Sequence, residues 1–148
     1  MGRLSGTAAI ELPLPIADVW PTVADVGSIG EWQSTIGDVA VLERDAEGRA
    51  TRTSIEIDAK VKVLRSTLRV SYEEPRRVSW TQEQGDLSSL VGSWTLEDLG
   101  DGRTGATYAL EIDPGFGLSM FIRGEAEQKL RRKLVLVRPD ELRARLGA

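Results

Sequence analysis

The chain has 148 residues, 41% of them hydrophobic and 28% charged, with a formal net charge of −4 at pH 7. This balance is that of an ordinary globular protein, and the length predicts a single domain over residues 1–148. Cysteine and histidine are both absent from the sequence, which excludes disulfides, thiol nucleophiles, zinc ribbons and Ser–His–Asp triads. Because the sequence also lacks a P-loop and a GxGxxG motif, we expect no cofactor and no bound metal.

The hydropathy and charge patterns limit where the protein can be located in the cell and which classes of partner it can bind. No apolar run approaches the roughly 20 residues that a membrane span needs, and the first residues are too mixed in polarity for a signal peptide. We therefore expect a cytoplasmic protein with no stable membrane insertion. Residues 123–148 carry eight Lys and Arg against four Asp and Glu, a balance of +4, within an acidic chain. The acidic total argues against nucleic acid as a partner, and the basic segment is either a solvated helix face or a docking surface.

The N-terminal segment predicts a strand followed by two helices. Ile10 and Leu12 alternate with polar neighbours, as in a half-buried strand, and Pro13 ends that strand because proline supplies no ladder N–H. Pro15 suits a helix start. One apolar helix face then follows at spacings of three and four, made of Ile16, Val19, Trp20, Val23 and Val26. After Gly27, Ser28 is placed to cap a short second helix that carries Trp32.

Strand patterns dominate the middle of the chain. The alternating stretches lie at residues 39–44, 51–58, 64–72, 78–84, 92–96 and 106–112. The second and third of these differ in register by one residue, which predicts a turn or bulge near 58–62. With the N-terminal strand they make about seven strands, and the short turns between them indicate antiparallel pairing.

A long C-terminal helix is expected from near Leu118. Its stripe consists of Met120, Phe121, Gly124, Glu127, Leu130, Leu134 and Val137. Pro139 should kink or break this helix near Arg138. A large antiparallel sheet has one apolar face to cover, and this helix is the one predicted element long enough to cover it. The fold class is therefore α+β, with a space for an apolar ligand between sheet and helix.

Four segments in this order carry a resemblance to a known family. They are IELPLPIADVWPTVADVGSIGEW (10–32), YEEPRRVSW (72–80), GSWTLED (92–98) and TYALEIDPG (107–115). From about Thr7 to Leu146 the chain resembles the START-like (SRPBCC, helix-grip) superfamily, and within it the bacterial polyketide cyclase/dehydrase and lipid-transport group. The resemblance implies a seven-stranded curved antiparallel sheet, in the order β-α-α-β6-α, wrapped around a long C-terminal helix. It also implies a cavity for hydrophobic molecules such as polyketides, lipids or quinones.

Several side chains are candidates to line that cavity. Trp80, Trp94 and Tyr108 fall on the inward phase of their strands, and the family places the short helix with Trp32 near the cavity rim. Inward polar residues are costly to bury without partners. The predicted ligand-binding set is Trp32, Ser66, Leu68, Val70, Tyr72, Trp80, Gln82, Trp94, Tyr108, Leu110, Met120, Phe121, Glu127 and Leu130. The alternative for each aromatic residue is plain core packing, which we assign to Trp20. A glycine in a strand, Gly92, indicates a bulge or a close approach.

Three functions are compatible with these patterns. The first is binding or transport of a hydrophobic small molecule by a monomer or homodimer. The second is a polyketide aromatase/cyclase, in which positioning and exclusion of water carry much of the chemistry. Its proton-transfer candidates are Tyr72, Tyr108 and Glu127. Cyclases of this family use Arg and Tyr inside the cavity, so the outward phase of Arg65 and Arg69 argues against that activity.

The third function is an interaction module of the same fold. It is motivated by the basic terminal helix, with Arg131, Arg132 and Lys133 as the residues that would contact a partner.

Overall fold

The computed structural model describes residues 3–59, 62–119 and 123–148. Over these ranges the chain forms one seven-stranded sheet with helical segments at its N-terminal and C-terminal sides. The elements are β1 (Leu4–Leu12), α1 (Ile16–Ala24), the 3₁₀ turn η1 (Val26–Glu31), β2 (Ile36–Arg44), β3 (Ala50–Asp58), β4 (Val63–Glu73), β5 (Arg77–Gly85), β6 (Ser89–Gly100), β7 (Arg103–Asp113), α2 (Phe116–Ser119), α3 (Gly124–Arg131), the π-helical segment η2 (Arg132–Leu136) and α4 (Arg138–Leu146). Within the described ranges, no helix is long and apolar enough to cross a membrane.

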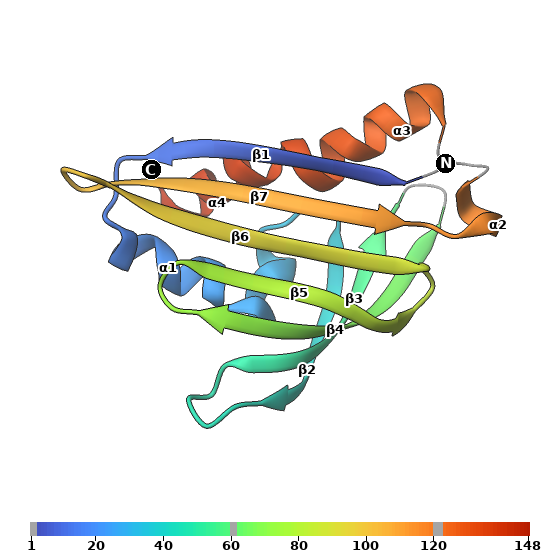
Figure 1. Cartoon of the computed structure of the whole chain (residues 1–148), viewed down its shortest axis with the longest axis horizontal. Helices are drawn as coiled ribbons and strands as arrows, with labels where there is room; N and C mark the ends of the chain where they lie inside the picture. The colour runs from blue at the N-terminus through green and yellow to red at the C-terminus, as the bar shows by residue number, and fades with distance from the viewer. Residues whose placement is uncertain (1–2, 60–61, 120–122) are drawn as a thin grey trace.

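The sheet is antiparallel and has the strand order β1-β7-β6-β5-β4-β3-β2. The strands from β2 to β7 follow one another as a meander, whereas β1 pairs with β7, from Leu4 opposite Ile112 to Leu12 opposite Thr104. Figure 1 shows α3 and α4 beside β1 and β7, and α1 packs against β6, β7 and α4. The C-terminal helical segments and η1 therefore cover the same concave face, as the predicted helix-grip fold requires.

The predicted alternation of inward and outward side chains is confirmed along the central strands. Along β4, Ser66 and Leu68 are buried, whereas Arg65 and Arg69 are exposed. The register change expected near 58–62 falls between β3 and β4, where Asp58 pairs with Val63. A period of two is what places alternate residues on the buried face of a sheet.

The N-terminal helices differ from the prediction in one detail. Pro15 immediately precedes α1, as expected, and Trp20 belongs to the core with 7% of its surface exposed. Ser28 is not a cap: it lies inside η1, which Asp25 precedes, and Trp32 follows the last residue of the turn. The 3₁₀ turn begins directly after α1, so no separate cap position remains for Ser28.

The C-terminal helix does not run without interruption from near Leu118, as the sequence predicted. Arg123 has an extended backbone, with φ −141° and ψ 152°, and α3 begins at Gly124. The next irregularity is η2, where the Val137 N–H donates to the Arg132 carbonyl five residues back, at 3.0 Å. The break expected near Arg138 is present, because η2 ends at Leu136 and α4 begins at Arg138, with Val137 between them. Pro139 lies in the first turn of α4, where the missing N–H costs no hydrogen bond.

Candidate functional site

A small, partly open cavity lies between the concave face of the sheet, η1 and the C-terminal helix, with a volume of about 40 Å³. Its aliphatic lining comes from α1, η1, β2, β3, β6, β7 and η2: Val23, Val26, Ile29, Ile36, Ile55, Ile57, Leu90, Leu110, Ile112 and Leu134. The polar or aromatic lining residues are Gln33, Trp80, Trp94, Tyr108 and Arg138. By this measure a water needs roughly 10–15 Å³, so the cavity has room for a few waters and expands for anything larger.

Four aromatic rings contact one another in a row, and three of them line the cavity. Ring centroids lie 6.3 Å apart between Trp32 and Trp94, 4.9 Å between Trp94 and Tyr108, and 5.8 Å between Tyr108 and Trp80. All three pairs are tilted, within the range of favourable aromatic packing. Trp94 and Tyr108 are directly opposite in the β6–β7 register, so adjacent strands set this arrangement.

Gly92 determines where the Trp80 indole lies. It is opposite Trp80 in the β5–β6 register, and a Cβ at this position would lie 2.4 Å from the Trp80 Nε1. The close approach expected at Gly92 is therefore that of an aromatic side chain. Only a glycine leaves room for this indole against the sheet.

Arg138 is the one charged side chain among the described cavity residues, and 1% of its surface is exposed. One terminal nitrogen donates to Glu141 Oε1 at 2.7 Å, and the other donates to the Thr35 hydroxyl. Glu141 also accepts the Ser34 backbone N–H at 2.9 Å. The buried guanidinium is thus compensated by a carboxylate that is itself held by the segment after η1.

Two nitrogen donors at the cavity remain unpaired. Among the described residues, no hydrogen-bond partner reaches the Arg138 Nε or the Trp94 Nε1. Both groups flank Tyr108: the Arg138 Cζ lies 5.8 Å from its ring centroid and the Trp94 ring 4.9 Å. Burial raises the pKa of Tyr108, an effect that the positive charge of Arg138 opposes. Two N–H groups of the cavity-lining side chains are therefore buried without a partner among the described residues.

Some of the predicted site residues line the cavity, and others lie elsewhere in the core. Trp80, Trp94, Tyr108 and Leu110 line the cavity, and Trp32 packs on Trp94. Leu68, Val70 and Leu130 are buried in the core but are not among the described cavity-lining residues. Met120 and Phe121 lie outside the described residues.

The two predicted inward polar residues of the sheet bind each other. The Ser66 hydroxyl donates to Gln82 Oε1 at 2.8 Å, and Gln82 Nε2 donates to the Leu87 carbonyl at 2.8 Å. Burial of these groups needs no ligand, because their hydrogen bonds are made within the protein.

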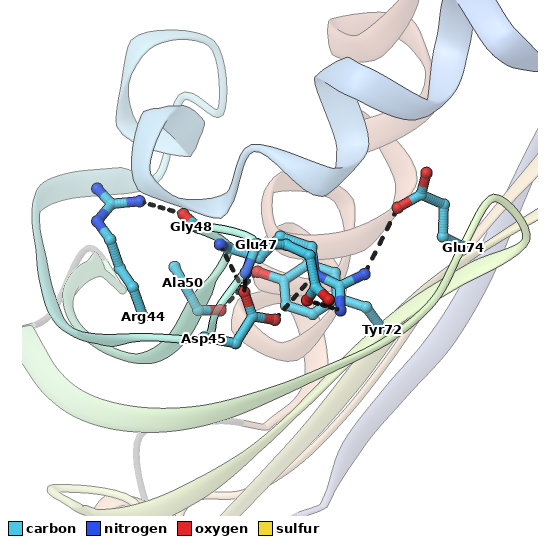
Figure 2. Close-up of polar contacts among 8 residues, drawn as sticks. Arg44, Asp45, Glu47, Gly48, Ala50, Tyr72 and Glu74 are labelled. Atoms are coloured by element: carbon cyan, nitrogen blue, oxygen red, sulfur yellow. Dashed lines mark hydrogen bonds and ion pairs between the residues drawn. The ribbon is translucent and has the colours of Figure 1, made fainter.

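Tyr72 lies in a polar cluster at the β2–β3 turn, shown in Figure 2 with Asp45, Glu47 and Glu74. Its hydroxyl donates to the Ala50 carbonyl at 2.5 Å, and burial raises its pKa to about 12. Tyr72 is not one of the described residues that line the cavity. Its hydroxyl proton is therefore engaged in a structural contact.

Glu127 and the basic residues of the terminal helix are engaged at the surface. Glu127 pairs with Arg131 at 2.7 Å, and the Arg131 Nε also donates to the Ser5 carbonyl at 2.9 Å. These contacts fasten α3 to β1. Arg132 is exposed, whereas Lys133 is partly buried.

Arg138 is the site residue that the sequence analysis missed. Leu130, Leu134, Arg138 and Leu142 are spaced by four and are all buried, so the sequence contained a signal for an inward Arg138. The outward arginines of β4 are exposed and paired with carboxylates, as the Arg65–Glu56 contact of 2.7 Å shows. An inward arginine is nevertheless present, from a different element. Over the described residues, no cluster of carboxylates could hold a metal ion.

Comparison with known proteins places the chain in a family. The family model described as polyketide cyclase/dehydrase and lipid transport matches residues 12–136. The chain belongs to this family. No curated protein matches the sequence. The family assignment confirms the resemblance drawn from the four sequence segments.

Several solved structures share the fold of this chain. A START superfamily protein from Mycobacterium smegmatis is 17% identical, with a TM-score of 0.78 and 97% of both chains covered. A protein from Thermus thermophilus is 18% identical, with a TM-score of 0.81 and the same coverage. The Zhui aromatase/cyclase from a Streptomyces species is 16% identical, with a TM-score of 0.67, covering 98% of this chain and 87% of that one. At these identities the likeness shows the fold, and function rests on the site.

Proposed function

We propose that this polyketide cyclase/dehydrase and lipid-transport family member binds and carries a hydrophobic small molecule in the cavity between the sheet and the C-terminal helix. The observation that carries the proposal is the largely apolar cavity lined by the rings of Trp80, Trp94 and Tyr108. Apolar surface removed from water contributes about 25 cal/mol per Å², so a flat ligand against these rings gains most of its affinity from burial. Such cavities with a few polar groups are the usual form of a small-molecule site.

Ligand entry requires the cavity to expand. Its volume of about 40 Å³ is too small for a polyketide or lipid chain without movement of the lining side chains. Trp32 and Ile36 are only partly buried, and Trp32 packs on the row through a single ring contact, with Trp94. We place the point of entry at this side of the cavity.

A titration with the neutral fluorescent probe N-phenyl-1-naphthylamine tests the proposal. Saturable enhancement of probe fluorescence is expected, with a stoichiometry of one. The variant Ile36→Phe adds bulk at the cavity and should weaken probe binding severalfold. Val91→Phe is the matched control, because Val91 is 46% exposed and not among the described cavity residues. No saturable binding by the wild-type protein would overturn the proposal.

A second candidate function is that of a polyketide aromatase/cyclase. The observation that favours it is the buried Arg138 beside Tyr108, since a cation and a phenol inside an apolar cavity can stabilise an enolate during ring closure. Burial raises the pKa of Tyr108, which makes its phenol a weaker acid, so its role in such a reaction is to donate a hydrogen bond to the enolate oxygen. The fold likeness to an aromatase/cyclase is compatible with this activity.

Co-expression with a minimal polyketide synthase distinguishes the two functions. A cyclase changes the ratio of cyclised aromatic products, and Tyr108→Phe reduces that change. A carrier leaves the product ratio unaltered while still binding the fluorescent probe. Tyr72→Phe serves as the control, because the Tyr72 hydroxyl is bonded to the Ala50 carbonyl outside the cavity.

A further inference from the structure

The chain between η1 and β2 forms a compact loop that separates the cavity from solvent. Gln33 lines the cavity, whereas its neighbour Ser34 is exposed, so the wall here is one chain thick. The two ends of the loop meet, since a Cβ on Gly30 would lie 2.6 Å from the Gly37 carbonyl oxygen. Compact surface loops whose ends lie close together are frequently functional. Residues 30–37 are called the lid loop below.

One side of the lid loop is attached to β3 through its backbone. The Asp58 N–H donates to the Thr35 carbonyl at 2.8 Å, and Ile36 lies opposite Ile57 in the β2–β3 register. The register then shifts between Ile36 and Val39. An irregularity of this kind interrupts the ladder and bends the strand. The attachment to β3 is therefore suited to act as a hinge.

Side chains of α4 hold the other side of the lid loop. Glu141 accepts the Ser34 N–H at 2.9 Å, and Arg145 pairs with Glu31 at 2.7 Å. These two contacts are called the latch below. The Arg145 and Glu31 side chains are 38% and 62% exposed, and an exposed ion pair contributes little to stability. This pair can therefore break without leaving a buried charge uncompensated.

We propose that the lid loop opens the cavity by turning about its attachment to β3, and that the latch to α4 keeps it closed. The inference rests on the proposed binding function, since a cavity of about 40 Å³ must open to admit a ligand. Trp32 belongs to the lid loop, so opening withdraws its ring from that of Trp94. The closed loop makes the same latch contacts over an empty and an occupied cavity. The latch therefore sets the rates of entry and exit and leaves the affinity nearly unchanged.

Reversal of one charge of the latch gives the first test. Arg145→Glu places two like charges side by side, and should raise the association and dissociation rate constants of N-phenyl-1-naphthylamine about threefold each. Stopped-flow fluorescence measures both rates, and the Kd should stay within twofold of wild type. The double variant Glu31→Arg, Arg145→Glu restores an ion pair of opposite polarity, and both rate constants should return toward the wild-type values.

Arg143→Glu is the matched control for this charge reversal. Arg143 is an exposed arginine of the same helix, and its Nε donates to the Ala148 carbonyl at 3.1 Å. The control changes the net charge by the same amount and should leave both rate constants at the wild-type values. Equal acceleration in Arg143→Glu and Arg145→Glu would assign the effect to net charge and contradict the latch, as would wild-type rates in Arg145→Glu.

Amide hydrogen exchange tests the lid loop without any ligand. The Ser34 N–H exchanges when it is released from Glu141, so it should exchange about threefold faster in Arg145→Glu than in the wild-type protein. The Asp58 N–H lies at the hinge and should exchange at the wild-type rate. This difference separates opening of the loop from a general loss of stability. Equal acceleration at both amides would mean that the loop does not open on its own.

The absence of cysteine from the chain allows the lid loop to be locked. In the double variant Glu31→Cys, Arg145→Cys, a short bis-maleimide joins the two thiols across the latch. The crosslinked protein should take up N-phenyl-1-naphthylamine at least tenfold more slowly than the same variant with both thiols capped by N-ethylmaleimide. Uptake at equal rates would mean that the ligand enters elsewhere, and would overturn the inference.

The outcomes separate this inference from the proposed function. If the crosslinked and capped proteins bind the probe at the same rate, the binding function stands and the lid inference fails alone. If the wild-type protein does not bind the probe, the proposed function fails. Exchange of the Ser34 and Asp58 N–H groups then still decides whether the loop opens about β3.

Discussion

Two arginines of this protein have almost the same neighbours and different environments. Arg49, in the cluster of Figure 2, pairs with Asp45 at 2.9 Å and lies over the Tyr72 ring, with its Cζ 4.7 Å from the centroid. Arg138 pairs with Glu141 at 2.7 Å and lies near the Tyr108 ring at 5.8 Å. The side chain of Arg49 is 29% exposed, whereas that of Arg138 is 1% exposed.

The difference lies in how many partners each guanidinium has. Arg49 contacts three carboxylates, those of Asp45, Glu47 and Glu74. Arg138 has one carboxylate and one hydroxyl, and its Nε is unpaired among the described residues. The Arg49 cluster ties two turns of the sheet together, and each of the three Arg49 guanidinium nitrogens has a carboxylate partner. The Arg138 cluster lies beside the cavity and leaves one buried nitrogen without a partner among the described residues.

The largest difference between the two clusters should be seen in stability. Glu141→Ala leaves Arg138 buried and uncompensated, and should lower the free energy of unfolding by about 3 kcal/mol. Glu47→Ala removes a partner of Arg49 whose side chain is 67% exposed, and should cost less than about 0.5 kcal/mol. Urea unfolding followed by tryptophan fluorescence measures both. Equal losses would show that the clusters do not differ in the way described.

The aromatic row beside Arg138 is the next feature to disturb. Gly92→Ala places a methyl group 2.4 Å from the Trp80 Nε1, and should cost about 2 kcal/mol through displacement of the indole. Gly105→Ala is the control, since its Cβ would meet only the Leu99 side chain, at 3.7 Å. That control should change the free energy of unfolding by less than about 1 kcal/mol. A stability of Gly92→Ala equal to wild type would mean that Trp80 has free space to move.

A smaller effect is expected at the tyrosine of the surface cluster. Tyr72→Phe removes the hydrogen bond to the Ala50 carbonyl and should lower stability by about 1 kcal/mol. It should leave the affinity for N-phenyl-1-naphthylamine within twofold of wild type, because Tyr72 is not among the described cavity residues. Thermal unfolding and the probe titration check the two parts. A large loss of probe affinity would place Tyr72 in the binding site.

The smallest effect near neutral pH concerns ionisation of the two tyrosines. Burial raises the pKa of Tyr72 to about 12, and burial also raises the pKa of Tyr108. A raised pKa means that the folded state favours the neutral phenol, so this stabilisation is complete below the unfolded value near 10 and is lost as pH rises above it. Urea midpoints measured from about pH 9 to about pH 11.5 should fall for the wild-type protein. They should fall less steeply for the double variant Tyr72→Phe, Tyr108→Phe.

The sheet could be predicted from the sequence because alternation of apolar and polar residues reports directly on a half-buried strand. In β4, for example, Ser66 and Leu68 are buried whereas Arg65 and Arg69 are exposed. The spacing of apolar residues on a helix face likewise predicted that Trp20 is buried. The bond between Ser66 and Gln82 could not be predicted, because it depends on the register shift between β4 and β5 near Leu68. Local patterns do not specify how two strands are shifted past each other.

Arg138 was missed for a physical reason. The expected stripe followed a regular helix and placed Val137 inward, but the π-helical segment η2 adds a residue to one turn and brings Arg138 to that face. Such insertions in a helix are frequent at functional sites. A lone arginine in a basic segment next to a proline also resembles an ordinary surface residue. The aromatic row could be predicted from strand alternation, whereas the one sequence signal for the buried cation was the spacing of four that Arg138 shares with Leu130, Leu134 and Leu142.

The position of β1 has a consequence for how the chain reaches its native state. β1 is made before the other strands of this sheet, yet its partner is β7, with Leu4 opposite Ile112. The meander from β2 to β7 can assemble by short steps, one hairpin at a time. The pairing of β1 closes a loop of most of the chain, and such distant pairings are slow to form. During synthesis, the earliest strand must therefore wait until the last one has emerged.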